Sequence, residues 1–133
     1  MANSPTDSVR IALFNEKNVD EFLILDESDD VGNYKLPGGK FDSEDETPSQ
    51  CALREILEEL GIGPNEIQLS QVANLLNDDG VSRRYIFTAL IDAGLPRPSN
   101  EVNTCIWTRT VPEGKNSKHI DAAIGAAREV LKT

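Results

Sequence analysis

Short apolar runs alternate with polar segments through most of the chain. Residues 9–14 and 22–25 are two such runs, and the polar turn 15–20 separates them. Runs of this length between polar segments predict two buried strands. Residues 67–76 and 82–92 have the same character and predict two further strands.

The remaining segments predict a hairpin, a last strand and a C-terminal helix. The Asn77-Asp78-Asp79-Gly80 sequence is typical of a hairpin turn, and residues 104–108 predict a short strand. Residues 26–33 form an acidic loop. Near the end of the chain, with Ser117 as the expected N-cap, apolar residues recur at helical spacing: Ile120, Ile124, Ala127 and Leu131.

A central helix is predicted between Thr47 and Gly61. Thr47 suits the N-cap, Pro48 suits the first helical position and Gln50 completes a capping box, while Gly61 ends the helix. Its apolar residues fall in one stripe, which we expect to pack on the sheet: Ala52, Leu53, Ile56, Leu57 and Leu60. The order of the elements predicts an α/β fold, an α/β/α sandwich with a mixed β-sheet packed between helices.

The length of the chain suits one domain. Its 133 residues can bury a core without covalent staples. We expect residues 8–133 to form this domain and residues 1–7 to form a flexible tail, because the polar start lacks the basic and apolar segments of a signal peptide. The chain has no apolar run of about 18 residues, so we expect no association with a membrane.

The net charge of −10 restricts the partners that the protein can bind. No basic stripe is available to neutralise the phosphates of a nucleic acid, so we expect no such partner. A small polyanionic substrate would be repelled as well unless cations intervene. Cys51 and Cys105 lack metal-ligand spacing, and two free thiols suit a reducing cytoplasm better than a disulfide framework does.

The central helix also has a charged side. Arg54, Glu55, Glu58 and Glu59 fall outside the apolar stripe, and Glu55 lies three and four residues before the other two glutamates. The spacing alone does not decide between two interpretations. The side is either an ordinary solvated acidic face or a cradle of carboxylates for a hard cation such as Mg²⁺ or Mn²⁺.

The segment before the helix favours the second interpretation. Residues 36–40, LPGGK, form a glycine-rich turn that lets backbone groups approach a ligand closely. Together with Glu46 and residues 54–62, REILEELGI, this turn resembles the Nudix box, G-x5-E-x7-R-E-U-x-E-E-x-G-U with U aliphatic. From Glu46 onward every position matches. One departure is present, because six residues instead of five separate Gly39 from Glu46.

The resemblance to the Nudix family implies a metal site. In that family Glu55 and Glu59 are the expected principal ligands of Mg²⁺, for which Mn²⁺ can substitute. The family pattern adds Glu58 and the carbonyl of Gly38 as further ligands, and it places substrate at Gly39 and Lys40.

The resemblance also implies catalytic roles. Arg54 is expected to pair with Glu46 and to orient the carboxylates. Glu55 is the first candidate for the general base. The second candidate is Glu101, six residues before Trp107, which resembles an acidic residue that several family members use at the metal site. A solvent-exposed glutamate in a loop is the alternative for Glu101.

The reaction implied by the resemblance is hydrolysis of a nucleoside diphosphate linked to another group. The small size of the chain is similar to the branch that converts nucleoside triphosphates to the monophosphate and pyrophosphate. ADP-ribose, a nucleotide sugar or a dinucleoside polyphosphate are alternatives. Asn77 stands where ADP-ribose hydrolases often have a proline, and Tyr85 comes too late for the dinucleoside-polyphosphate signature.

Three further questions stay open on the sequence alone. A binding module with a catalytically silent Nudix fold is the rival to an enzyme. Asn116 and His119 are either base contacts or simply part of an exposed helix start. The protein is expected to be a monomer or a homodimer, since no interface is evident in the sequence.

Overall fold

The computed structural model describes residues 6–131. Within this range the chain forms six strands and two helices, which follow the predicted order with one extra strand. In chain order they are β1 (Ser8–Asn15), β2 (Asn18–Glu27), β3 (Gly38–Lys40), α1 (Pro48–Leu60), β4 (Ser70–Leu76), β5 (Arg83–Ile91), β6 (Val102–Thr108) and α2 (Ser117–Leu131).

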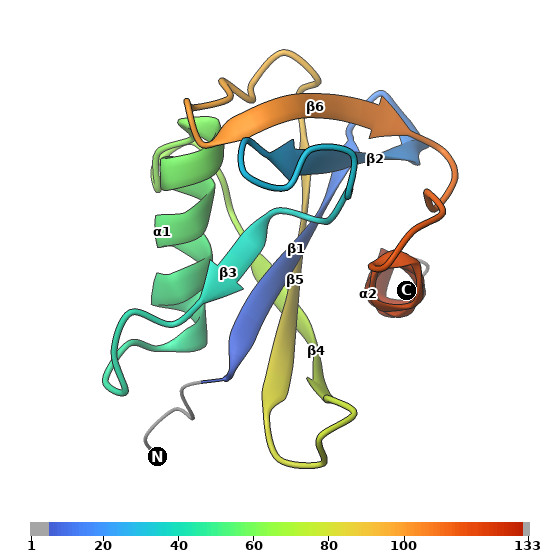
Figure 1. Cartoon of the computed structure of the whole chain (residues 1–133). Coiled ribbons are helices and arrows are strands. Elements are labelled where there is room, and N and C mark those ends of the chain that lie inside the picture. The colour runs from blue at the N-terminus through green and yellow to red at the C-terminus, as the bar shows by residue number, and fades with distance from the viewer. Residues whose placement is uncertain (1–5, 132–133) are drawn as a thin grey trace.

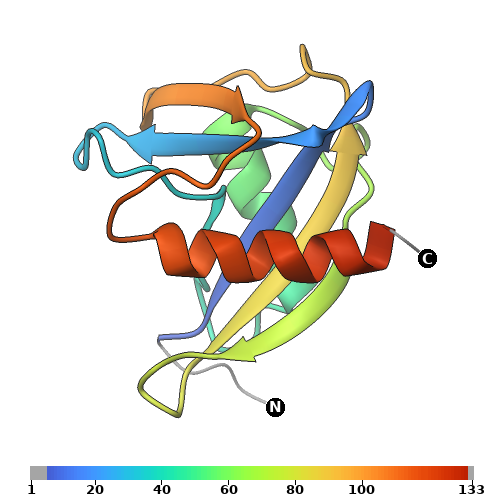
Figure 2. The same cartoon turned by 90° about the vertical axis from the view of Figure 1, so that its right-hand side faces the viewer.

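The strands form one mixed sheet between the two helices. Its order is β4-β5-β1-β2-β6, and β3 pairs with β1 outside this path. β1 and β5 are parallel, whereas the other pairs are antiparallel. α1 covers one face of the sheet and α2 covers the other (Figure 1). Turned by 90°, α2 crosses in front of the strands and α1 lies behind them (Figure 2). The predicted sandwich is therefore confirmed.

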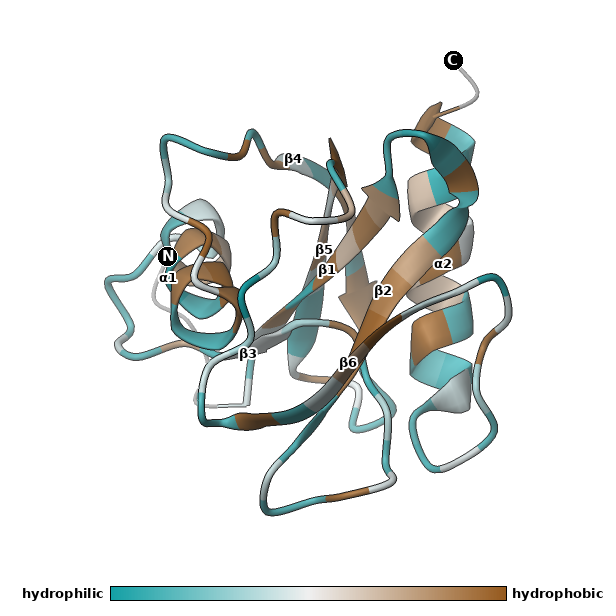
Figure 3. Ribbon diagram, turned by 90° about the horizontal axis from the view of Figure 1, so that it is seen from above, coloured by the Kyte–Doolittle hydropathy of each residue, from teal (hydrophilic) through white to brown (hydrophobic). Residues whose placement is uncertain are grey.

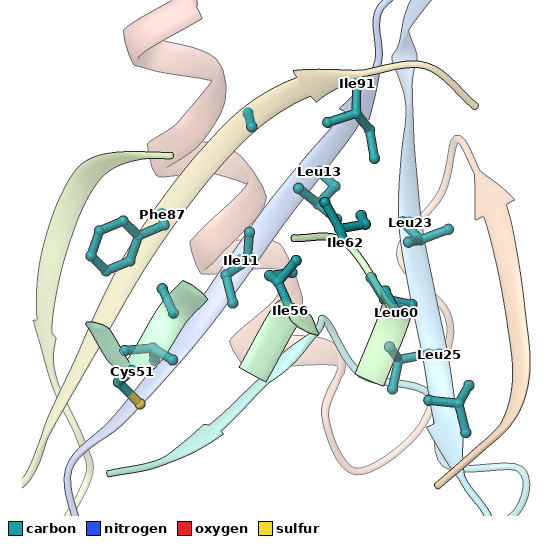
Figure 4. Close-up of a cluster of buried hydrophobic side chains, with 14 residues drawn as sticks. Ile11, Leu13, Leu23, Leu25, Cys51, Ile56, Leu60, Ile62, Phe87 and Ile91 are labelled. Carbon is teal, nitrogen blue, oxygen red and sulfur yellow. The ribbon is translucent and has the colours of Figure 1, made fainter. Parts of the chain in front are cut away.

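Alternation along β1 divides the core into two clusters. Ile11 and Leu13 point toward α1, where they pack with Ile56 and Leu60 (Figure 4). Ala12 and Phe14 alternate with these residues along β1 and join the second cluster, under α2. Apolar residues concentrate on the strands and the connecting loops are mostly hydrophilic (Figure 3). No helix between residues 6 and 131 is long and apolar enough to cross a membrane.

The predicted bounds of α1 are confirmed, but its predicted buried stripe is wrong in part. Thr47 and Gln50 form the reciprocal capping box, and Gly61 ends the helix at a φ of 64°. Leu57 is 49% exposed, whereas Glu59 is only 3% exposed. The buried face is rotated because α1 packs against the Gly38–Gly39 turn of β3 as well as on the sheet. Because Gly38 and Gly39 have no side chains, they leave room there for the longer side chain of Glu59 from the helix.

The apolar spacing of α2 predicted its buried face more closely. Ile120, Ile124 and Ala127 are buried as expected, and Leu131 at the end of the helix is 39% exposed. Ser117 is the first residue of the helix, whereas an N-cap is the residue before it. The predicted N-cap role of Ser117 is therefore wrong.

Two smaller predictions need correction at the edges of the sheet. β3 was not predicted, because a three-residue strand that begins with two glycines has neither apolar alternation nor strand-forming residues. Residues 1–5 of the expected tail lie outside the described residues. Asp7, also assigned to that tail, is buried, and its carboxylate accepts a hydrogen bond from the Arg83 backbone N–H at 2.7 Å.

Candidate active site

An open cleft of about 400 Å³ lies between β3, α1 and two loops. Figure 1 shows the start of β6 beside one end of α1, and Glu101, in the loop before β6, is one of the residues that line the cleft. Four chain segments contribute the lining residues: Glu27, Ser28, Asp29, Gly38, Gly39, Glu55, Glu58, Glu59 and Glu101. Six of these nine residues have a carboxylate side chain, so the cleft favours a cation.

The two glycines of β3 allow the backbone to reach the cleft floor. Gly38 has a φ of 144°, and a Cβ built on it would lie 2.1 Å from the carbonyl oxygen of Val9. A Cβ on Gly39 would lie 2.7 Å from the carboxylate of Glu55. No other residue fits either position without moving its neighbours. The Gly-Gly pair therefore brings β3 and the carboxylates of α1 into direct contact.

Glu59 is buried beneath this turn. Its Oε1 accepts a hydrogen bond from the Gly38 backbone N–H at 2.9 Å. Burial, with a smaller contribution from the neighbouring Glu55, raises the pKa of Glu59 to about 8, although the hydrogen bond from Gly38 opposes the shift. A glutamate in such a place costs stability when it is ionised without a cation. The cost points to a functional reason for keeping it there.

Arg54 links the acidic residues on the exposed side of α1. Its Nε donates to Glu46 Oε2 at 2.8 Å and its Nη2 donates to Glu46 Oε1 at 3.1 Å, a bidentate pair. Its Nη1 donates to Glu55 Oε1 at 2.9 Å and lies 3.3 Å from Glu58 Oε2. These contacts raise the pKa of Arg54 and lower the pKa of Glu46, in each case chiefly through the hydrogen bond between the two.

The extra residue of the Nudix-like box lies in a loop that folds back on this pair. The Asp42 backbone N–H donates to Glu46 Oε1 at 2.9 Å, and the carbonyl of Lys40 accepts from Arg54 Nη2 at 3.0 Å. The Arg54–Glu46 pairing thus forms despite the longer loop. Lys40 is exposed and is not one of the residues that line the cleft.

Glu55 and Glu58 are turned toward Arg54 and away from a common centre. Burial raises the pKa of Glu55, and the charge of Arg54 opposes that shift. Within residues 6–131, no three Asp, Glu, His or Cys side chains converge tightly enough to hold a metal ion as they stand.

The loop that carries Glu101 is tied to the end of α1. The Arg97 N–H donates to the Leu60 carbonyl at 2.6 Å, and the Ser99 N–H donates to the Glu59 carbonyl at 2.9 Å. The Glu101 carbonyl in turn accepts from the Ser28 N–H at 2.9 Å. These bonds bring Glu101, distant in sequence, to the rim of the cleft.

The structure thus gathers most of the predicted site residues in one place. The cleft contains Gly38, Gly39, Glu55, Glu58, Glu59 and Glu101. Sequence reasoning missed Glu27 and Asp29, which also line it. They belong to the acidic stretch before the glycine turn, and that local excess of carboxylates was the only available signal. Glu27 pairs with Lys35 across this loop.

The two cysteines are free and lie outside this site. Burial raises the pKa of the Cys51 thiol to about 12 and that of Cys105 to about 11, so both thiols stay protonated at neutral pH. Cys51 is fully buried, which fits the expected role of a small apolar side chain.

Sequence comparison identifies the family. A model of the NUDIX domain matches residues 4–110, most of the chain. The protein belongs to the Nudix hydrolase family. The predicted family and enzyme class are thereby confirmed. No curated protein matches this Nudix chain by sequence.

Solved structures show the same fold. An ADP-ribose pyrophosphatase from Streptococcus suis has a TM-score of 0.72 at 21% identity, covering 98% of this chain and 94% of its own. A MutT Nudix hydrolase from Burkholderia pseudomallei has a TM-score of 0.71 at 20% identity, with coverages of 93% and 98%. The NUDIX domain of Shewanella oneidensis NrtR, complexed with ADP ribose, has a TM-score of 0.70 at 23% identity, with coverages of 97% and 90%.

Proposed function

We propose that this Nudix protein is a pyrophosphohydrolase that depends on Mg²⁺, with Mn²⁺ as a substitute. Its substrate is a nucleoside diphosphate linked to another group. The first candidate is a nucleoside triphosphate, hydrolysed to the monophosphate and pyrophosphate. The observation that carries this proposal is the buried carboxylate of Glu59 beneath the Gly38–Gly39 turn, at the base of a cleft of carboxylates.

The residues of the cleft fit a hard divalent cation. Members of the Nudix family generally use divalent metals. Glu59 is desolvated and has one backbone donor, so a cation would offset the cost of its negative charge. Carboxylate and carbonyl oxygens are the donors that Mg²⁺ prefers. We assign Glu55 and Glu59 as principal ligands, with Glu58 and the Gly38 carbonyl completing the set.

A bound cation would neutralise phosphoryl oxygens and lower the pKa of an attacking water. Glu55 would accept the proton of that water as the water oxygen bonds to phosphorus and the anhydride P–O bond breaks. The displaced group, pyrophosphate or the nucleoside monophosphate according to which phosphorus is attacked, would leave with the bonding electrons. Gly39 lets the substrate approach the β3 backbone, since it has no side chain at the cleft wall.

Arg54 is a positioning residue in this scheme. It touches neither the water nor the phosphorus, and its bidentate pair with Glu46 fixes the guanidinium beside Glu55 and Glu58. When these two carboxylates turn to the cation, Arg54 keeps its contacts with Glu46 and with the Lys40 carbonyl.

The choice of general base has a direct test. Glu101 lines the same cleft from the opposite loop and is the second candidate. In Glu101→Gln, kcat should fall by no more than a few-fold if Glu55 is the base. A loss of order 10²-fold or more, together with an altered pH profile of kcat, would transfer the role to Glu101.

A panel of nucleotides tests the function as a whole. We expect Mg²⁺-dependent release of nucleoside monophosphate, fastest from a nucleoside triphosphate and abolished by a chelator. Two of the neighbours are named for ADP-ribose, so ADP-ribose belongs in the panel with a nucleotide sugar and a dinucleoside polyphosphate. Tight binding of one of these without turnover would identify a silent binding module instead. A monomeric or homodimeric state and a cytoplasmic location remain predictions.

A further inference from the structure

The guanidinium of Arg54 lies among four carboxylates that come from two segments of the chain. Two of them, Glu55 and Glu58, are on α1. The other two, Asp42 and Glu46, are in the loop between β3 and α1. Asp42 Oδ2 lies 3.1 Å from Arg54 Nε, although the Asp42 side chain is 68% exposed. An exposed ion pair adds little to stability, so any importance of this contact lies in its effect on the other carboxylates.

The nitrogens of the guanidinium divide these carboxylates into two pairs. Nη1 faces the α1 pair, at 2.9 Å from Glu55 Oε1 and 3.3 Å from Glu58 Oε2. Nε faces the loop pair, at 2.8 Å from Glu46 Oε2 and 3.1 Å from Asp42 Oδ2. The α1 pair lines the carboxylate cleft, and the loop pair lies outside its lining. Arg54 therefore stands between the carboxylates of the cleft and those of the loop.

The loop holds its side of the guanidinium through several groups. Arg54 Nη2 donates to the Lys40 carbonyl at 3.0 Å and to Glu46 Oε1 at 3.1 Å. The Asp42 N–H donates to the same Glu46 oxygen at 2.9 Å, which fixes Asp42 beside the pair. The Glu46 N–H closes the loop by donating to the Ser43 carbonyl at 3.3 Å. This loop carries the extra residue of the Nudix box, and it brings a second carboxylate to the guanidinium.

One guanidinium cannot neutralise four carboxylates. When all four are ionised, three negative charges of the cluster are left uncompensated. Each negative charge on the loop side offsets part of the field that Arg54 exerts on Glu55 and Glu58. A divalent cation in the cleft competes with Arg54 for the same two carboxylates. A negative charge at Asp42 therefore favours the cation in this competition.

We propose that Asp42 is a positioning residue of the metal site and acts through Arg54. By offsetting the guanidinium charge from the loop side, it lets Glu55 and Glu58 leave Arg54 for the cation. Arg54 then keeps its partners in the loop, so its charge is not left unpaired. Asp42 lies outside the cleft and touches neither the cation nor the substrate. That Glu55 and Glu58 bind the cation rests on the proposed function.

The affinity for Mn²⁺, measured by electron paramagnetic resonance of the free ion, tests this role without turnover. Asp42→Asn keeps the size of the side chain and removes its charge. Arg54 should then hold Glu55 and Glu58 more firmly, and the Kd for Mn²⁺ should rise about two- to fivefold, the range that an exposed ion pair allows.

Asp45→Asn is the matched control, because it removes one charge from the same exposed loop. Asp45 makes no ion pair with Arg54 in the described part of the chain. Its Kd should stay close to that of wild type, since salt screens exposed charges that share no contact. An equal rise of Kd in Asp42→Asn and Asp45→Asn, or no rise in Asp42→Asn, overturns the proposal.

Two further variants separate positioning from a direct effect of charge on the cation. Asp42→Glu retains a carboxylate and should retain the wild-type Kd; a Kd as weak as that of Asp42→Asn would count against the proposal. Arg54→Met removes the residue through which Asp42 acts, so Asp42→Asn should cause no further change in that background. The same factor in both backgrounds would show that Asp42 acts on the cation directly and would overturn the proposal. The comparison with Asp45→Asn decides the matter if Arg54→Met does not fold.

The outcomes distinguish the role of Asp42 from the proposed function. No saturable Mn²⁺ binding by the wild-type protein would overturn both. Wild-type binding with the same Kd in Asp42→Asn and Asp45→Asn would overturn only the role of Asp42. The expected rise in Kd together with no hydrolysis of any nucleotide would refute the proposed function and leave the role of Asp42 standing.

Discussion

The two helices flank the same sheet, yet they bury different kinds of face. α2 buries only apolar residues: Ile120, Ala123, Ile124 and Ala127. α1 buries Glu59 and leaves Leu57 half exposed. α2 packs on strands with ordinary side chains, whereas α1 also packs on the Gly38–Gly39 turn. Apolar spacing therefore locates the buried face where packing alone decides it, and it fails where a charged group has a role in the interior.

The largest expected effect concerns the buried face of α1. Ile56 is fully buried, so Ile56→Ala should lower the free energy of unfolding by roughly 2–5 kcal/mol through lost burial and a residual cavity. Leu57→Ala, on the next residue, should cost less than about 1 kcal/mol, because that side chain is 49% exposed. Urea unfolding of both variants measures the difference. Equal losses of unfolding free energy would indicate that Leu57 is as buried as Ile56 and would contradict the rotated face.

The next effect concerns catalysis. Glu59→Gln keeps the acceptor that binds the Gly38 N–H and removes the charge. If that charge holds the metal, kcat should fall of order 10²-fold or more, as for removal of one preorganised stabilising group. Asp121→Asn, an exposed acidic position on α2, is the matched control and should keep wild-type kcat. Steady-state kinetics with saturating Mg²⁺ measure kcat for both variants. A wild-type kcat in both would contradict the claim that the charge of Glu59 holds the metal.

A third effect appears in the pH dependence of stability without metal. Burial raises the pKa of Glu59 to about 8 in the folded protein, above its ordinary value of 4.5. The unfolded chain therefore loses this proton first, and the contribution of Glu59 to stability declines as pH rises from 4.5 through 8. Relative to wild type, Glu59→Gln should gain roughly 1–3 kcal/mol over this window. Chemical unfolding in a chelator at pH 5 and pH 8 measures the gain, and a constant difference would argue against the shift.

The smallest effect compares the starts of the two helices. Thr47 caps α1 through the Gln50 N–H at 3.1 Å, so Thr47→Ala should cost about 1 kcal/mol. Ser117 lies inside the first turn of α2, and Ser117→Ala should cost a few tenths of a kcal/mol at most. Thermal melts of the two variants decide the point. A larger loss for Ser117→Ala would mean that this residue caps α2 after all.

The sequence predicted what local rules control. The capping box, the glycine stop, the hairpin at residues 77–80 and the order of the elements along the chain all follow from short-range chemistry. Glu59 was placed outside the buried stripe because no local rule distinguishes a buried glutamate from a solvated one. Glu27 and the Arg84–His119 contact depend on segments that are far apart in sequence. Such contacts are visible only once the chain is folded.

Binding of Mn²⁺ tests most directly the claim that the buried carboxylate of α1 holds a metal. Free Mn²⁺ is measured by electron paramagnetic resonance as the ion is titrated into wild-type protein, Glu59→Gln and Asp121→Asn. We predict the same Kd for wild type and Asp121→Asn, and a Kd at least about tenfold weaker for Glu59→Gln, since removing a charged ligand lowers cation affinity. An unchanged Kd in Glu59→Gln would contradict the account.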